Sequence, residues 1–302
     1  IAQGKKVRIL KKKLGIIGGS GLYNIDDSIK SIWETIDTPW GKPSDQVLTL
    51  KFKTYDICFI PRHGRNHTIS PSNINFRANI DALKQKSVTD IISISAVGSL
   101  REELSPGCFV LVDQFIDLTT DRKKTFYDEE IIAHVSMAHP TSTDLIELCC
   151  KSLKKQNIKY KKGATYVAIE GPHFSSKAES NLYKSWGADI IGMTNMPEAK
   201  LAKEAEMRYC TVGMVTDYDS WRFKDDHIDI DSILKTLSDN TILAKKMVKD
   251  IIDNLDLSVN SNDDTHRCLD TAIITPHDKM TEKTMNKLKN VAGRVLFNNN
   301  LD

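Results

Sequence analysis

Seven short apolar segments recur along this 302-residue chain, and they constrain its fold more than any other feature. They are residues 14–17, 57–60, 91–95, 109–112, 165–169, 189–191 and 210–216. Each segment is continuously apolar rather than alternating, which is typical of strands in a sheet that is covered on both faces. Between the second and third segments, Phe76, Ile80 and Leu83 recur at helical spacing. Ser72 precedes them as the expected N-cap, and strand, helix and strand in this order predict an α/β fold.

Two helices and a loop are expected after residue 228. Residues 229–254 carry one apolar stripe, which predicts a long helix along one side of the domain. Asn, Asp and Ser interrupt residues 255–270, which predicts a mobile loop, and a last helix is expected over about 281–295. No internal repeat or long linker divides the sequence. We therefore expect one domain over residues 14–302, with residues 1–13 as an N-terminal extension.

The composition is that of an ordinary globular protein without a strong charge bias. Lys and Arg number 42 against 40 Asp and Glu, so the formal charge of +2 predicts neither nucleic acid nor an anionic membrane as partner. No apolar stretch approaches the ~18 residues of a membrane span, and the first residues lack the apolar block of a secretory signal. The six cysteines form no Cys-x-x-Cys pair and are expected to be buried, reduced thiols. We therefore expect a cytoplasmic protein.

A glycine-rich stretch, GIIGGSG, begins in the first expected strand. The dinucleotide fingerprint Gly-x-Gly-x-x-Gly fails here, because Asn24 stands where its third glycine belongs. The sequence also contains no Gly-x-x-x-x-Gly-Lys-Ser/Thr motif, which argues against a P-loop nucleotide triphosphatase. What remains is a set of backbone N–H groups that can converge on an anion, with the Ser20 hydroxyl as a further donor. A tight turn fits this stretch, taken alone, as well as a phosphate site does.

Two further strand ends carry residues suited to anions or close contacts. Arg62 could offer a bidentate fork to phosphate, and His63 a second donor or a proton-exchanging group. Residues 95–98 are small and include one hydroxyl, so a ligand could approach the backbone closely, although a close-packed turn has the same signature. The position of the basic loop after a strand strengthens its interpretation, because ligands of open α/β sheets bind at the carboxyl ends of the strands.

Aromatic and acidic residues follow two other strands. Phe174 offers a stacking surface and Glu170 a carboxylate, although a loop Phe is often simply packed. Thr216 is followed by Asp217 and Asp219, whose side chains point to the same side of an extended segment. Such a pair suits hydrogen bonding to a heterocycle, with one acid able to donate a proton. An Asp-rich turn or a metal site also fits, but no comparable set of metal ligands accompanies the pair, and no Gly-x-Ser-x-Gly elbow supports a serine hydrolase.

Taken in order, these motifs resemble the trimeric purine nucleoside phosphorylase and methylthioadenosine phosphorylase family. The matching stretches are GIIGGSGL, DTPWGKPSD, RHGRNHTISPSNINFRANIDALK, GSLREELSPG, VDQFIDLTT, TFYD, IEGPHFSSKAES, WGADIIGMTNMPEAKLAKEAEM and VTDYDSW, over roughly residues 14–256. The methylthioadenosine branch is the more similar, chiefly through DTPWGKPSD, FIDLTT, TFYD and TDYDSW. The resemblance implies a single α/β domain with a central mixed, largely parallel sheet flanked by helices. It also implies a homotrimer with active sites at the subunit interfaces.

The resemblance further implies reversible phosphorolysis of 5′-methylthioadenosine to adenine and 5-methylthioribose 1-phosphate, in purine and methionine salvage. Phosphate would be a co-substrate, no metal or organic cofactor would be required, and the enzyme would act in the cytoplasm or nucleus. Phosphate would be held by Ser20, Arg62, His63, Ser95 and Ala96. The nucleoside would be bound by Val97, Gly98, Phe174, Ile191, Gly192, Met193, Thr194, Thr216, Asp217 and Asp219.

Individual roles follow from the same resemblance. Met193 would line the ribose with its backbone N–H at a sugar hydroxyl, and Phe174 would pack on the purine. Asp217 would be the general acid at N7 and Asp219 would lie near the 6-amino group, with His63 as a further catalytic group. The 5′ substituent would contact Ile230, Ile233 and Leu234, together with His134 of a neighbouring subunit. That apolar lining suits a methylthio group and leaves a 5′-hydroxyl few partners.

Three residues depart from the family pattern. Gly192 stands where the methylthioadenosine branch is expected to have Asn, Val97 where Cys or a smaller residue is expected, and His173 where Arg or Lys is expected. Residues 257–278 look inserted. These departures keep open a phosphorylase of broader specificity that accepts adenosine or 6-oxopurine nucleosides. A catalytically silent nucleoside-binding protein of the same fold is an alternative from another class, and a dinucleotide-dependent enzyme is a third.

Overall fold

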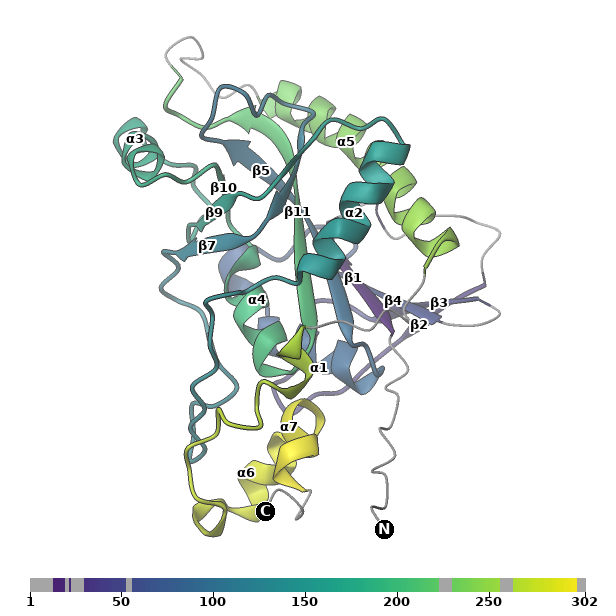
Figure 1. Ribbon diagram of the computed structural model, residues 1–302, viewed down its shortest axis with the longest axis vertical. Helices are drawn as coiled ribbons and strands as arrows, with labels where there is room; N and C mark the ends of the chain where they lie inside the picture. Colours follow the sequence, from purple (N-terminus) through teal and green to yellow (C-terminus); the bar gives the residue numbers. More distant parts are fainter. Residues whose placement is uncertain are drawn as a thin grey trace, which may run out of the picture.

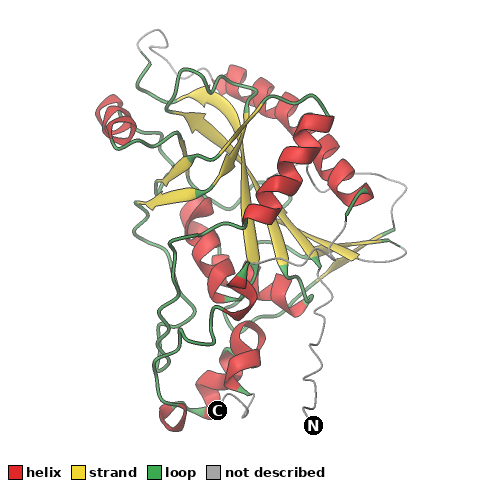
Figure 2. Ribbon diagram, viewed as in Figure 1, coloured by secondary structure: helices red, strands yellow, loops and turns green. Residues whose placement is uncertain are grey.

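Every strand that the structure describes belongs to one central sheet (Figure 1, Figure 2). The computed structural model describes residues 13–19, 22, 30–52, 56–222, 230–255 and 263–297. The strands are β1 Leu14–Gly18, β2 Ser31–Glu34, β3 Val47–Lys51, β4 Asp56–Pro61, β5 Asp90–Ser99, β6 Phe109–Val112, β7 Gln114–Asp117, β8 Tyr160–Lys162, β9 Thr165–Ala168, β10 Ile190–Gly192 and β11 Arg208–Tyr218. Their order is β2-β3-β4-β1-β5-β10-β9-β7, while β11 pairs with β5 and β6, and β6 also pairs with β8. Six of the ten described pairings are parallel, which confirms the predicted mixed, largely parallel sheet.

Helices cover both faces of this sheet (Figure 2). They are α1 Phe76–Gln85, α2 Thr143–Lys155, α3 Lys177–Ser185, α4 Asn195–Glu204, α5 Ile230–Asp253, α6 Glu282–Lys287 and α7 Lys289–Leu296. Along β1, Ile17 packs into the core that contains residues of α1, α4 and α7, whereas Ile16 packs into the core that contains residues of α2 and α5. Because both faces are buried, successive residues of a strand are apolar, as the continuous apolar segments predicted.

Strand β5 is the element that brings the site together. It pairs in parallel with β1 and β11, and its last residues pair antiparallel with β10. The carboxyl ends of β4, β5 and β11 therefore lie at one edge of the sheet. The pairing of β11 with β5 shifts register between Val215 and Asp217, so Thr216 is the extra residue of a bulge. A bulge redirects side chains, and it allows adjacent residues of β11 to face the same side.

All seven predicted strands are present, whereas β2, β3, β7 and β8 were not predicted. Three of the missed strands, β2, β7 and β8, lie at ends of the sheet and are partly exposed. An edge strand with polar residues such as the sequence YKK has no apolar run to reveal it. The missed strands extend the sheet without changing the order of the predicted ones.

The predicted helices are present, with one incorrect cap. Helix α5 confirms the long helix, and α1 confirms the helix after the basic loop. The N-cap of α1 is Asn75 rather than Ser72, because the Asn75 side chain accepts a hydrogen bond from the Ala78 amide. Ser72 instead lies in the 3-10 turn Pro71–Asn73, and its hydroxyl donates to the Glu170 carboxylate.

The segment before the last helices is packed against the rest of the protein. Leu269 is buried, and Ile273 forms a β-bridge with Ala133, so the expectation of a mobile loop is wrong for residues 263–270. Residues 256–262 lie outside the described part of the chain. The single last helix that the sequence predicted is two short helices, α6 and α7, which meet at Leu288.

The cysteines and the membrane prediction can also be compared with the structure. All six cysteines are free thiols, and five are buried, whereas Cys268 is partly exposed. Among the helices that the structure describes, none combines the length and the apolar character needed to cross a membrane.

Candidate active site

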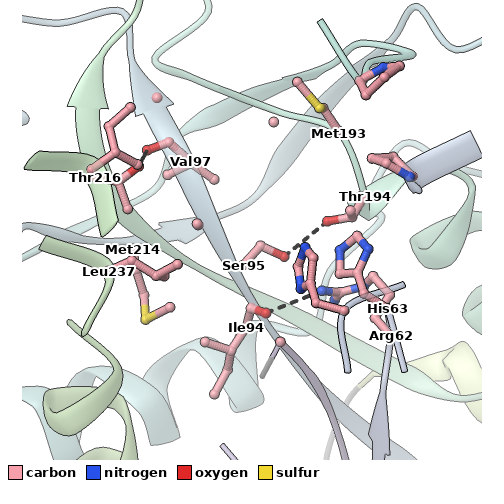
Figure 3. A pocket seen from close by; sticks show the side chains of 18 of the residues that line it. Arg62, His63, Ile94, Ser95, Val97, Met193, Thr194, Met214, Thr216 and Leu237 are labelled. Atoms are coloured by element: carbon pink, nitrogen blue, oxygen red, sulfur yellow. Dashed lines mark hydrogen bonds between the residues drawn. The ribbon is translucent and has the colours of Figure 1, made fainter. Parts of the chain in front are cut away.

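A cavity of about 630 Å³ opens at the carboxyl ends of β4, β5, β10 and β11, with α5 along one side (Figure 3). Every predicted site residue that the structure describes lines it, except two. The predicted residues that line it are Arg62, His63, Ser95, Ala96, Val97, Gly98, Phe174, Ile191, Gly192, Met193, Thr194, Thr216, Asp217, Asp219 and Ile233. They come from segments up to 171 residues apart (Ile233 − Arg62), and the parallel strands bring them together at one sheet edge.

The two exceptions are Leu234 and His134. Leu234 is 55% exposed and does not line the cavity, so its predicted place there is corrected. Ile233 and Leu237 line it instead, because residues four apart lie on one face of a helix and Leu234 is rotated by about 100° from Ile233. His134 lies in a separate hollow with Lys200 and Glu204. Ser20 and the side chain of Ile230 lie outside what the structure describes.

One end of the cavity, the anion end, is built around Arg62. The Arg62 side chain is 2% exposed, and its Nε and Nη2 donate to the two carboxylate oxygens of Glu198 at 2.7 and 3.0 Å. Nη2 also donates to the Ser93 hydroxyl (2.5 Å), and Nη1 lies 3.3 Å from the Ile94 carbonyl (Figure 3). The fork that the sequence suggested for phosphate is therefore occupied by Glu198. A buried carboxylate partner compensates the buried guanidinium and fixes its orientation.

Two hydroxyls complete this end of the cavity. The Ser95 and Thr194 hydroxyl oxygens are 3.3 Å apart, one from β5 and the other from the turn between β10 and α4 (Figure 3). Either hydroxyl can donate to the other or to a ligand. Thr194 was predicted in the nucleoside group, and the geometry places it beside Ser95 of the phosphate group.

His63 is held in one tautomer. Its Nδ1 lies 2.8 Å from the Ile69 carbonyl, which only accepts, so Nδ1 carries the proton. Burial and the nearby Arg62 charge lower the pKa of His63 to about 4. In the neutral ring Nε2 is therefore an acceptor. His67 stacks on His63 with ring centroids 4.4 Å apart, and both rings line the cavity.

The opposite end, the base end, carries the two carboxylates. Burial, opposed by the Thr216 hydrogen bond and reinforced by the Asp219 charge, raises the pKa of Asp217 to about 6. Burial also raises the pKa of Asp219. Asp219 is 4% exposed, and hydrogen bonds from the Ser180 hydroxyl, the Ser220 amide and the Ser175 hydroxyl oppose the effect of burial on its pKa. Both carboxylates belong to residues that line the cavity, so a donor group of a ligand can bind there.

The structure gives a local reason for Gly192. A Cβ at this position would overlap the Tyr166 hydroxyl and lie 2.7 Å from its Cζ. Tyr166 is fully buried, and its hydroxyl lies 3.4 Å from the Thr194 amide, which donates to it. Tyr166 therefore takes the space of a side chain at position 192. Of the other departures, Val97 lines the cavity and His173 is exposed outside it.

Sequence analysis missed several residues of the cavity, among them His67, Met214, Leu237 and Thr241. His67 lies in the basic loop that was singled out, so its type and position were available as a signal. Leu237 and Thr241 follow Ile233 by one and two helical steps of four residues. Met214 had no signal beyond its place in an apolar strand.

A family model described as the phosphorylase superfamily matches residues 13–253. The chain belongs to the phosphorylase superfamily. This phosphorylase-superfamily chain is 50% identical over 284 residues to the S-methyl-5′-thioadenosine phosphorylase of Rhodospirillum rubrum, a match that covers 94% of this chain and 97% of the relative. It is 48% identical over 291 residues to the protein of the same name from Cereibacter sphaeroides, covering 95% and 99%.

Solved structures agree with the assignment of this chain to the phosphorylase superfamily. A methylthioadenosine phosphorylase from an antarctic soil metagenomic library matches with a TM-score of 0.86 and 39% identity over 93% of this chain and 98% of that one. The methylthioadenosine phosphorylase of Schistosoma mansoni, solved with adenine, matches with a TM-score of 0.80 and 29% identity over 87% and 99%. The fold of this chain is therefore that of the phosphorylases.

Proposed function

We propose that this protein is an S-methyl-5′-thioadenosine phosphorylase, which cleaves 5′-methylthioadenosine with phosphate into adenine and 5-methylthioribose 1-phosphate. The observation that carries the proposal is one cavity with a partly buried and a buried carboxylate at one end and buried hydroxyls beside a buried Arg at the other. The similarity to relatives of that name, over nearly the full chain, supports the choice of substrate. The reaction would return adenine and the methylthioribose unit to purine and methionine salvage.

The base end suits a 6-aminopurine. Asp219 lines the cavity and can accept a hydrogen bond, and the 6-amino group of adenine can donate one. Asp217, with its pKa near 6, holds a proton in part of the population near neutral pH and can pass it to N7. Phe174, half exposed at the cavity rim, would pack on the purine once a ligand is bound.

The anion end suits phosphate. Ser95 and Thr194 offer hydroxyl donors, and Arg62, which Glu198 holds in place, lines the same cavity. Ala96 and Ser20 are the other residues assigned to phosphate. His63 Nε2 accepts a hydrogen bond, and the proton of monohydrogen phosphate can make it. The Nδ1 bond to Ile69 keeps that orientation.

The chemistry follows from these two ends. The C1′–N9 bond breaks ahead of the formation of the C1′–O bond to phosphate, so positive charge develops on the ribose while negative charge develops on the purine. The proton from Asp217 neutralises the charge on the purine, and the phosphate stabilises the charge on the ribose before it attacks C1′. Met193 lines the same cavity and would contact the ribose through its backbone N–H.

The 5′ substituent would face α5. Ile233 and Leu237 are apolar there, and the Thr241 hydroxyl already donates to the Leu237 carbonyl at 2.7 Å. A 5′-hydroxyl would therefore be buried with few partners, at a cost of ~1–3 kcal/mol, whereas a methylthio group would not. His134, which lies outside this subunit's cavity, would come from a neighbouring subunit of a homotrimer.

A phosphorylase of broader specificity, acting on adenosine or 6-oxopurine nucleosides, is the second candidate, and Gly192 was the residue that favoured it. The overlap with Tyr166 accounts for Gly192 without reference to the base. The proposal also includes one phosphorylase domain over residues 14–302, and a cytoplasmic location in keeping with six free thiols.

The test is product analysis with a matched pair of variants. The wild-type protein is expected to release adenine from 5′-methylthioadenosine only with phosphate, yielding a sugar 1-phosphate. Asp217→Asn should abolish most of this activity, whereas Asp189→Asn, which alters a carboxylate paired with Arg101, should retain it. Binding of the nucleoside without phosphate-dependent cleavage would refute the enzyme and favour the silent binding protein.

A further inference from the structure

We propose that Arg122 is a positioning residue that holds the ribose and purine side of the cavity in place without lining it. The proposal rests on the proposed function only for the identity of the nucleoside. Arg122 follows β7 in the chain and its side chain is 1% exposed. It is not among the residues that line the cavity, and sequence analysis gave no reason to select it.

The guanidinium of Arg122 joins two segments of the cavity rim. Nη1 donates to the Met193 carbonyl (2.7 Å) and to the Met196 carbonyl (2.6 Å). Nη2 donates to the Glu170 carbonyl (2.7 Å), and Nε donates to the Glu170 carboxylate (3.0 Å). The Phe76 ring lies 5.5 Å from the guanidinium carbon and limits its movement. One buried cation thus fixes the turn between β10 and α4 relative to the segment that begins at Glu170.

Both segments carry residues proposed to touch the nucleoside. Met193 lines the cavity at the ribose, and its carbonyl is the one that Arg122 binds. Glu170 is followed by Pro172 and Phe174, which line the cavity at the purine. A displacement of either segment would therefore move groups on the nucleoside. At the anion end, Arg62 is held by Glu198, and Thr194, although it lies in the same turn, is held by Tyr166 and Ser95.

Glu170 extends the same support to a third segment. Its carboxylate accepts hydrogen bonds from the Ser72 hydroxyl and from the Thr120 amide (2.6 Å), in addition to Arg122. Burial opposes its charge, but the hydrogen bonds from Ser72, Thr120 and Arg122 outweigh burial and lower its pKa to about 2. Pro71, the neighbour of Ser72, lines the cavity. The ionised pair of Arg122 and Glu170 thereby connects three parts of the rim.

The geometry requires arginine rather than lysine. Arg122 uses N–H groups on three different nitrogens. They bind the carbonyls of Met193 and Met196 in one segment, and the carbonyl and carboxylate of Glu170 in the other. A guanidinium presents five such donors in a rigid plane, whereas an ammonium group is a single point with three. Arg122→Lys should therefore keep the charge and lose the connection between the two segments.

The experiment measures KM for nucleoside and for phosphate separately in Arg122→Lys, with Arg208→Lys as the matched control. Arg208 is similarly buried and forms ion pairs with Asp90 and Asp144, but it lies at the amino end of β11, away from the cavity. Arg122→Lys should raise KM for 5′-methylthioadenosine about tenfold or more, as expected for the loss of a charge-assisted hydrogen bond. KM for phosphate should change by less than about threefold. A threefold change in KM corresponds to less than half of the free energy of a tenfold change.

Arg208→Lys should lower the melting temperature and leave both KM values unchanged. Equal changes of the two KM values in Arg122→Lys, or no change in either, would overturn the positioning role. If Arg122→Lys does not fold, Glu170→Gln decides, because it retains the bonds of Arg122 to Met193 and Met196 and weakens the bonds that the Glu170 carboxylate accepts from Arg122, Ser72 and Thr120. It should raise KM for the nucleoside alone, and an unchanged nucleoside KM would overturn the proposal.

The two proposals can fail separately. A wild-type protein that does not cleave 5′-methylthioadenosine overturns the proposed substrate. The same KM comparison, made with adenosine or inosine if the protein cleaves one of them, then still supports or overturns the role of Arg122.

Discussion

Gly192→Ala tests whether position 192 is dictated by Tyr166. The new Cβ would overlap the Tyr166 hydroxyl and lie 2.7 Å from Cζ and 3.2 Å from Cε2. Tyr166 is fully buried and packs on Phe115 with ring centroids 5.7 Å apart, so it has little room to move away. Overpacking of this kind costs about 1–3 kcal/mol of the free energy of unfolding. In a chain of this size, that lowers the melting temperature by about 2–4 °C per kcal/mol.

A double-mutant cycle isolates the cause. In a Tyr166→Leu background the overlapping ring and hydroxyl are absent, so Gly192→Ala should cost less than about 0.5 kcal/mol. Gly293→Ala is the control, since a Cβ there would meet its nearest neighbours at 3.8 and 3.9 Å within α7 and should not destabilise the protein. Unfolding is followed by urea titration of all five proteins, the wild type included.

The same variants bear on base specificity. Because Gly192 acts through Tyr166 in this account, Gly192→Ala should leave the ratio of adenosine to inosine cleavage unchanged even where total activity falls. An equal destabilisation by Gly192→Ala in the wild-type and Tyr166→Leu backgrounds would refute the packing argument. A shift toward one base would show that residue 192 contributes to base choice.

Three further predictions concern the two ends of the cavity. Asp217→Asn should lower kcat/KM for 5′-methylthioadenosine by about 10²–10⁴-fold with circular dichroism unchanged, and unchanged kinetics would remove Asp217 from the acid role. In the wild type, kcat/KM should fall as the pH rises through about 6, because Asp217 then loses the proton it donates, and this limb should be absent in Asp217→Asn. Glu198→Gln should raise KM for phosphate by about tenfold, because it removes the charge that holds Arg62, and an equal effect on nucleoside KM would contradict this assignment.

Much of the fold could be predicted because a strand that is buried on both faces has a continuous apolar sequence. Of the strands that are covered on both sides, those with a continuous apolar run were found. Strand β3 is buried in both cores through Val47, Leu48 and Leu50 but was missed, because Thr49 interrupts its apolar run. The exposed strands β2 and β8 have no continuous apolar run. The N-cap of α1 was misplaced because Ser72 and Asn75 are both good capping residues, and the choice depends on Glu170, which is 98 residues away and binds Ser72.

The site was predictable to the extent that it lies at strand ends. Arg62, Ser95 and Asp217 each follow or end an apolar run, and parallel strands bring such ends together. The pairing of Arg62 with Glu198 spans 136 residues and could not be read from local sequence. The overlap between Tyr166 and position 192 likewise depends on how β9 and β10 pair.

Base release from 5′-methylthioadenosine, adenosine and inosine, each with and without phosphate, tests the central claim most directly. Relative kcat/KM values compare the transition states of the three nucleosides. We expect phosphate-dependent cleavage with 5′-methylthioadenosine preferred. Adenosine should be second because its 5′-hydroxyl is buried with few partners, and inosine poorest because it lacks a 6-amino group to donate to Asp219. A preference for inosine, or cleavage that does not need phosphate, would contradict this expectation.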